Sequence, residues 1–201
     1  DYALRGYGTS DSSAVHAVCM ERSHKLLQPL GAMSMIVPLA LVSTQRMKAV
    51  QNILENGRTV WYSNFAWRPA KLFDTVNRAL TIFVAIPRGS GKVSTTAYKK
   101  WTSDTREPPT PTICYYAISR ARSAFWVPKI SSSIEGKLLE KMLSHKVTVA
   151  QLGVKQGAKI FYRCDGGLYW KVFTDFAPRF VLNGVEGNSS RETSFGVDSK
   201  N

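Results

Sequence analysis

The sequence predicts an α/β fold in which helices pack on a sheet, followed by a β-rich region that contains one helix. Two observations support this prediction. Helix-like and strand-like patterns alternate over residues 12–65 with short links, which is the rhythm of βαβ units. Beyond residue 146 the patterns are mostly strand-like and are separated by turns. Apolar residues make up 44% of the chain, which is enough to build a hydrophobic core.

The first helix and strand follow from local patterns. Apolar residues recur at helical spacing over residues 12–27, and Ser12 or Ser13 can cap this helix. Residues 32–38 are almost continuously apolar, which is typical of a strand covered on both faces. We therefore expect residues 32–38 to form a parallel, buried strand.

The next elements extend the same α/β pattern. A helix is expected over residues 43–55, because Asn56–Gly57 is a common helix stop. Strands are expected over residues 59–65 and 79–86. Residues 87–92 resemble a phosphate-binding loop, but the glycine spacing and the residue after Lys92 do not fit that motif. We interpret them as a tight hairpin turn.

Strand-like patterns dominate the rest of the chain. They cover residues 93–98, 112–118, 159–163 and 168–173. A helix is expected over residues 132–145, with Ser133 as its cap. The last two strand patterns suggest an aromatic-rich hairpin over Tyr162–Phe173, and the polar tail from Asn188 is expected to be loose.

Composition narrows the functional class. The 27 basic and 14 acidic residues give a net charge of +13, which suits an anionic partner. Three scattered cysteines do not make a disulfide framework, and no apolar run approaches the roughly 20 residues of a membrane span. We therefore expect a reduced, cytoplasmic protein without membrane association. No metal-ligand spacing, catalytic triad or carboxylate pair stands out. The first residue is Asp1, from which we expect a piece of a longer protein.

The charge is concentrated between Arg88 and Lys129, where eight basic residues face two acidic ones. Aromatic residues are interleaved with them, which suits contact with phosphates and bases. A solvated basic face over a β core remains open as the alternative. The DNA-binding candidates, with two aromatics from the expected hairpin, are Arg88, Lys92, Lys99, Lys100, Trp101, Arg120, Arg122, Tyr169 and Trp170. For Trp170, a place in the core stays open as the alternative and is slightly favoured over a DNA contact.

Five segments carry a further pattern through their order along the chain: Tyr7–Ser10, Met20–Ser23, Leu26–Pro38, Arg68–Val76 and Tyr162–Trp170. In this order they resemble adenine-specific (N6) DNA methyltransferases of type II restriction-modification and phage-defence systems. The resemblance implies the C-terminal half of a class I, Rossmann-like, S-adenosylmethionine-dependent fold with an antiparallel last strand. It implies a catalytic-domain part over residues 1–125 and the start of a target-recognition region over residues 126–201.

The resemblance also implies partners and an activity for the intact enzyme. That enzyme would transfer a methyl group from S-adenosylmethionine to an adenine flipped out of DNA. Its partners would be DNA and the remainder of the same polypeptide or a complementing chain. An aromatic residue near the end of one strand stacks on the flipped base in some relatives, which makes Phe83 the base-stacking candidate.

Two motifs of the family are missing from this sequence. No Gly-rich loop follows an early strand, and the Pro108–Pro109 pair has Glu107 and Thr110 where the catalytic tetrad requires other residues. We therefore expect no catalytic and no cofactor-binding residue, and an isolated chain that is inactive but contributes DNA contact. The alternatives are a stand-alone nucleic-acid-binding module without enzymatic activity and a degenerate structural paralogue.

Overall fold

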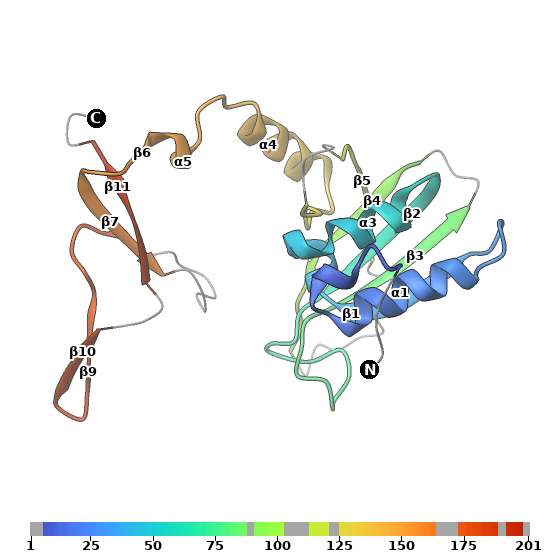
Figure 1. Cartoon of the computed structure of the whole chain (residues 1–201), viewed down its shortest axis with the longest axis horizontal. Coiled ribbons are helices and arrows are strands. Elements are labelled where there is room, and N and C mark those ends of the chain that lie inside the picture. Colours follow the sequence, from blue (N-terminus) through green and yellow to red (C-terminus); the bar gives the residue numbers. More distant parts are fainter. Residues whose placement is uncertain are drawn as a thin grey trace. The chain divides into compact units, whose positions relative to one another are not determined.

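A computed structural model describes residues 6–87, 91–102, 113–120, 125–163, 173–188 and 192–198 of the chain. The chain divides into two compact units, residues 1–140 (unit 1) and residues 141–201 (unit 2). Figure 1 shows the helices and strands of each unit. The functional division expected after residue 125 stays a prediction.

Unit 1 consists of one sheet with helices packed on it. Its strands are β1 (Met33–Pro38), β2 (Arg58–Phe65), β3 (Leu80–Pro87), β4 (Val93–Lys99) and β5 (Tyr116–Ile118). Its helices are η1 (Ser10–Ser12), α1 (Val15–Leu26), α2 (Ala40–Ser43), η2 (Gln45–Met47), α3 (Lys48–Glu55) and α4 (Ser133–Leu143), the last of which continues across the boundary. The sheet order is β1-β3-β2-β4-β5.

The sheet of unit 1 is mixed, which confirms the α/β class in its general form. β3 runs antiparallel to both of its neighbours, β1 and β2. β1 and β2 therefore point the same way without touching, and the connection through α2 and α3 crosses over β3. β4 pairs parallel with β2 and antiparallel with β5.

Two topological predictions are wrong. β1 is not a parallel strand covered on both faces: it pairs antiparallel with β3 at one border of the sheet, and Ile36 is 51% exposed. An apolar run reports burial tendency but not which strand becomes its neighbour. Residues 87–92 do not close a hairpin, because β2 lies between β3 and β4. Gly91 has a left-handed φ of 65°, and residues 88–90 lie outside the described residues.

The core of unit 1 lies between the sheet and the helices. Its largest buried apolar side chains are Met20, Leu41, Leu54, Tyr62 and Phe83. The expected helix over residues 43–55 is shortened to η2 and α3, because Thr44, with an extended backbone of φ −119° and ψ 135°, separates them from α2. The Thr44 hydroxyl donates to the Ala40 carbonyl at 2.8 Å, which ends α2.

α4 contains a glycine whose role is visible only in the packing. A Cβ atom at Gly136 would collide with the phenol ring of Tyr116 from β5. Gly136 costs the helix about 1 kcal/mol of propensity but allows this close approach. The cap lies one residue before the expected Ser133: the Ser132 hydroxyl accepts the Glu135 N–H at 3.3 Å, and the Glu135 carboxylate accepts the Ser132 N–H at 3.0 Å.

Unit 2 is β-rich, as the sequence indicates. Its elements are α5 (Val149–Leu152), β6 (Gly153–Val154), β7 (Ala158–Arg163), β8 (Phe173–Thr174), β9 (Arg179–Leu182), β10 (Val185–Asn188) and β11 (Glu192–Val197). They form a four-stranded antiparallel sheet in the order β6-β11-β7-β8 and a separate two-stranded ribbon of β9 and β10. β7 pairs with β8 through Tyr162 and Phe173, as the expected hairpin requires, and its turn lies outside the described residues.

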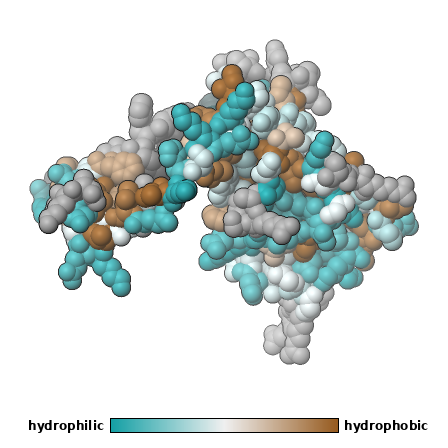
Figure 2. Space-filling view, turned by 90° about the horizontal axis from the view of Figure 1, so that it is seen from above, coloured by the Kyte–Doolittle hydropathy of each residue, from teal (hydrophilic) through white to brown (hydrophobic). Residues whose placement is uncertain are grey.

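The prediction of a loose tail is wrong, because β11 pairs along the whole of β7. One face of β11 carries Phe195 and Val197, which stand opposite Ile160 and Ala158. Polar residues and a glycine stand between the apolar ones along β11, so the amino-acid composition of the tail does not reveal this apolar face. In unit 2 no residue whose burial is described is fully buried, and Figure 2 shows apolar surface over this part of the chain.

Candidate nucleic-acid interface

The predicted DNA-binding residues that the structure describes do not form one continuous surface. Arg88, Arg122, Tyr169 and Trp170 lie outside the described residues. The remaining ones divide between the two ends of β4: Lys92 and Arg120 lie at its start, and Lys99, Lys100 and Trp101 lie at its end. A strand of seven residues spans roughly 23 Å, so the two groups cannot contact the same phosphate.

The end of β4 belongs to an edge of the sheet that we call the carboxyl edge. It consists of residues 66–79 and 99–102, where β2 and β4 end and β3 begins. The Ala66 N–H donates to the Lys99 carbonyl at 2.8 Å, and the Ala70 N–H donates to the Trp101 carbonyl at 3.1 Å. The loop between β2 and β3 is therefore tied to the segment after β4 by main-chain hydrogen bonds.

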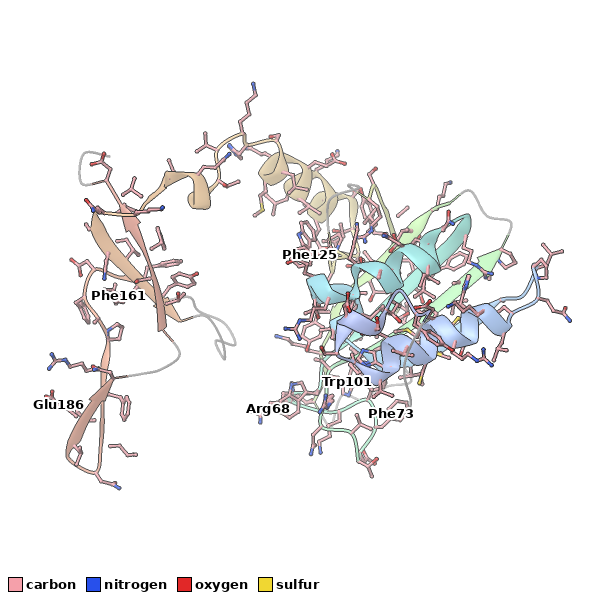
Figure 3. All side chains as sticks on the ribbon, in the orientation of Figure 1. Arg68, Phe73, Trp101, Phe125, Phe161 and Glu186 are labelled. Carbon is pink, nitrogen blue, oxygen red and sulfur yellow. The ribbon has the colours of Figure 1, made fainter. Side chains whose placement is uncertain are left out.

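The carboxyl edge is strongly basic. Its basic residues are Arg68, Lys71, Arg78, Lys99 and Lys100. Asp74 is its one acidic residue, so the net charge is 5 − 1 = +4. The Arg68 guanidinium lies 4.2 Å from the ring centroid of Trp67, and the Lys100 ammonium lies 5.8 Å from that of Tyr98. Figure 3 shows Arg68, Phe73 and Trp101 together at one end of unit 1.

The DNA-binding residues predicted from the sequence do not include three basic members of this edge: Arg68, Lys71 and Arg78. They lie in the long link between β2 and β3, outside the segment with the highest charge density. The excess of basic residues in that link was the available signal. The pairing of β2 with both β3 and β4 brings the link next to Lys99 and Lys100.

Trp101 is part of the scaffold of this edge. It is 9% exposed, and its ring packs edge-on against Phe65 with the centroids 5.8 Å apart. Its buried Nε1–H has no hydrogen-bond partner in the described part of the chain. The ring presents no open face on which a base could stack, so Trp101 anchors the segment that carries Lys99 and Lys100.

His16 adds no positive charge to unit 1 at neutral pH. Burial and, secondarily, the nearby Arg78 lower the pKa of His16. Its buried Nε2 atom has no partner among the residues that the structure describes. The five permanent cations, and not a titrating histidine, therefore set the potential of the carboxyl edge.

Phe83 is not available as a base-stacking residue. It is fully buried in the middle of β3, where it stands opposite Met35 of β1 and Tyr62 of β2. No base can reach the ring while the sheet is intact. The strand pattern identified Phe83 as apolar but did not show which side of β3 is covered by helices.

A buried polar network supports β2 close to the carboxyl edge. The Asn64 amide nitrogen donates to the Thr95 hydroxyl and to the Thr96 carbonyl, both at 3.1 Å. The Asn64 amide oxygen accepts the Thr81 hydroxyl at 3.1 Å. The pairing of β2 with β4 shifts in register between Tyr62 and Asn64. Asn64 thus joins three strands where that irregularity frees main-chain groups.

The opposite end of β4 borders an open pocket of about 950 Å³. Its polar lining residues are Asn52, Glu55, Asn56, Lys92, Ser119 and Arg120. Lys92 is exposed there. The Lys92 carbonyl accepts the Val60 N–H at 2.9 Å, whereas its side chain has no hydrogen bond within the described residues. Its role as a DNA contact stays a prediction.

Arg120 is engaged inside the protein. Its guanidinium forms an ion pair with Glu55 at 3.1 Å and donates to the Gln51 side chain at 2.6 Å and to the Trp126 carbonyl at 2.5 Å. The Tyr62 hydroxyl, whose pKa is raised by burial, donates to Glu55 at 3.0 Å. These contacts hold the segment around Arg120 against α3 and leave the guanidinium little capacity for a phosphate.

Two of the segments that carry the family resemblance contact each other. The Glu21 carboxylate on α1 accepts the Gly8 N–H at 3.2 Å, the Thr9 N–H at 2.9 Å and the Thr9 hydroxyl at 2.8 Å. It also pairs with Lys25 at 2.8 Å. Burial raises the pKa of Glu21, but the hydrogen bonds from Lys25, Thr9 and Gly8 outweigh it and bring the pKa to about 2.

Replacing Glu21 by glutamine is expected to lower the free energy of unfolding by about 1–3 kcal/mol at pH 6, because buried donors lose a charged acceptor. The folded pKa of about 2 lies below the usual 4.5, so the carboxylate stabilises fully above pH 4.5 and loses this effect as the pH falls towards 2. Urea unfolding at several pH values measures both proteins. A difference that does not shrink below pH 4.5 would contradict the assignment, and Glu140→Gln on the exposed face of α4 is the control.

The described residues do not form a metal site or a membrane-spanning helix. No group of three or more His, Cys, Asp and Glu side chains among them could hold a metal ion. None of the helices described has the length and apolar character to cross a membrane. In the comparisons with known proteins, no protein-family model and no curated protein matches the chain.

Proposed function

We propose that this chain is the C-terminal, non-catalytic part of an adenine-specific DNA methyltransferase, and that it contributes DNA contact. The observation that carries the proposal is the contact between Glu21 and the Gly8–Thr9 segment. Both belong to the motif order that resembles this family. A charged, buried contact between them gives a physical reason for their joint occurrence.

The topology of unit 1 supports the same proposal. The family fold has an antiparallel last strand, and in unit 1 β3, which lies inside the sheet between β1 and β2, runs antiparallel to both of its neighbours. β1 lies at the border of the sheet and pairs only with β3 in the described part of the chain. Apolar border strands are sites for pairing with another strand, and we propose that a preceding strand of the same enzyme, or of a complementing chain, pairs there.

The described residues that line the pocket of unit 1 do not suit S-adenosylmethionine. The pocket at the start of β4 is lined by Lys92 and by Arg120, whose guanidinium is held by Glu55 and Gln51. The sequence has no Gly-rich loop after an early strand. We propose that the cofactor and the catalytic tetrad belong to the remainder of the enzyme in the cytoplasm, and we derive no chemical step from this chain.

The proposal is tested on the chain and on its gene. Titration calorimetry with S-adenosylmethionine is expected to show no saturable binding at micromolar concentration. The roughly 300 codons upstream are expected to encode, in frame, the Gly-rich loop and an (Asn/Asp/Ser)-Pro-Pro-aromatic tetrad, a span set by typical domain sizes. The longer protein is then expected to introduce N6-methyladenine into plasmid DNA, as measured by mass spectrometry of nucleosides.

A matched control replaces the first residue of that tetrad by alanine, which should abolish methylation without affecting expression. A start codon close to Asp1, or micromolar cofactor binding by the isolated chain, would contradict the proposal. The first of these results would favour the stand-alone nucleic-acid-binding module, with which the basic carboxyl edge is also compatible.

A further inference from the structure

We propose that the carboxyl edge of unit 1 binds the phosphate backbone of a nucleic acid, with Arg68 and Lys100 as its principal contacts. This inference deepens the DNA contact of the proposed function and rests on it only for the class of ligand. It requires no methyl transfer, so it can fail or hold separately from the assignment to a methyltransferase.

The distribution of charge indicates a polyanion with regularly spaced charges. Five cations and one carboxylate occupy two adjacent segments, residues 66–79 and 99–102. The main-chain bonds from Ala66 and Ala70 keep these segments side by side. A single small anion would use one or two of these cations, whereas a nucleic-acid backbone presents a phosphate to each in turn.

Two of the cations are held in place before any ligand arrives. Arg68 lies over Trp67 and Lys100 over Tyr98, so each long side chain rests on an aromatic ring. Ordering a free arginine or lysine side chain costs up to about 2 kcal/mol of conformational entropy. Part of this cost is already met at the carboxyl edge, which favours binding by these two residues.

The frame under these cations is rigid. Trp101 is packed against Phe65, and Asn64 ties β2 to β3 and β4 through buried hydrogen bonds. Phe73 is 41% exposed on the loop of the same edge. An exposed ring beside cations suits the sugars and bases that accompany a phosphate chain and has no function toward a simple inorganic anion.

The other basic group of the sequence lacks these properties. The Arg120 guanidinium is held by Glu55 and Gln51, and the Lys92 side chain has no aromatic ring or hydrogen-bond partner among the described residues. The two ends of β4 therefore differ in their expected contact with a nucleic acid. Contacts to the nucleic acid are expected at its end and not at its start.

The experiment measures the anisotropy of a fluorescein-labelled 20-bp DNA duplex with the full chain over a salt series. The variant Arg68→Gln/Lys100→Gln is expected to lose two phosphate contacts. The slope of log K against log salt should then flatten by about 1.8, and affinity at 0.1 M salt should fall about 60-fold. The matched control is Lys137→Gln/Lys141→Gln, which removes the same charge from exposed positions of α4 and should leave both quantities unchanged.

Circular dichroism melting of each variant tests whether the fold is retained, because Arg68 and Lys100 also contact aromatic rings. An unchanged slope in the Arg68→Gln/Lys100→Gln variant would overturn the inference, and so would an equal loss in the control variant. A labelled heparin oligosaccharide serves as the second probe. Equal affinity for heparin, with an equal loss in the Arg68→Gln/Lys100→Gln variant, would show a general polyanion surface and would also overturn it.

Discussion

Replacing Phe83 by alanine is expected to destabilise unit 1 by about 3–5 kcal/mol. The ring is fully buried in the middle strand of the β1-β3-β2 part of the sheet, so the substitution leaves a cavity lined by Met35, Tyr62 and their neighbours. Urea unfolding followed by tryptophan fluorescence measures the change. The effect comes from lost apolar burial and from incomplete collapse of the cavity.

If the alanine variant does not fold, the free energy of unfolding can still be measured on Phe83→Leu. This variant retains most of the volume and should cost about 1–2 kcal/mol. Both variants test the base-stacking interpretation at the same time. If Phe83→Ala left stability unchanged and weakened DNA binding by about 1–3 kcal/mol, the ring would be a stacking residue and its place in the core would be wrong.

Replacing Asn64 by alanine is expected to cost about 3 kcal/mol, the second largest effect. The substitution removes three side-chain hydrogen bonds, each with a net contribution of about 1 kcal/mol. The substitution leaves the Thr96 carbonyl and the Thr81 hydroxyl without the hydrogen bond that each makes with Asn64 inside the sheet. The same unfolding experiment measures this change.

Thr81→Val is the matched control for Asn64, because it removes one donor of the network and keeps the shape of the side chain. We expect it to cost about 1 kcal/mol, and the double variant to cost less than the sum of the two single ones. Strict additivity would show that Asn64 and Thr81 do not interact in solution. It would also remove the argument that this network stiffens the carboxyl edge.

The secondary structure of unit 1 could be predicted where local patterns are strong. β2 and β3 lie close to the expected strands, because both combine β-branched and aromatic residues with clear turn signals at their ends. α1 lies within the expected range, and α3 ends before Asn56–Gly57 as predicted. These features depend on neighbours in sequence, which sequence patterns describe well.

The tail illustrates where such patterns are insufficient. β11 has too few apolar residues for a strand signal of its own, and its pairing with β7 supplies the main-chain hydrogen bonds that define it. The same holds for Gly136, which weakens α4 locally but is required by the ring of Tyr116 from another element. In both cases the decisive partner is distant in sequence.

By itself, the sequence determined the α/β class, most strands and helices of unit 1, the excess of positive charge and the motif order that resembles a DNA methyltransferase. Only the tertiary structure decided how the charges are grouped. The pairing of β2 with β4 places the loop that carries Arg68 beside the segment that carries Lys100, at the opposite end of β4 from Lys92. Charge composition is a sum over residues, whereas an interface depends on which strands become neighbours, and that is set by the packing of the whole sheet.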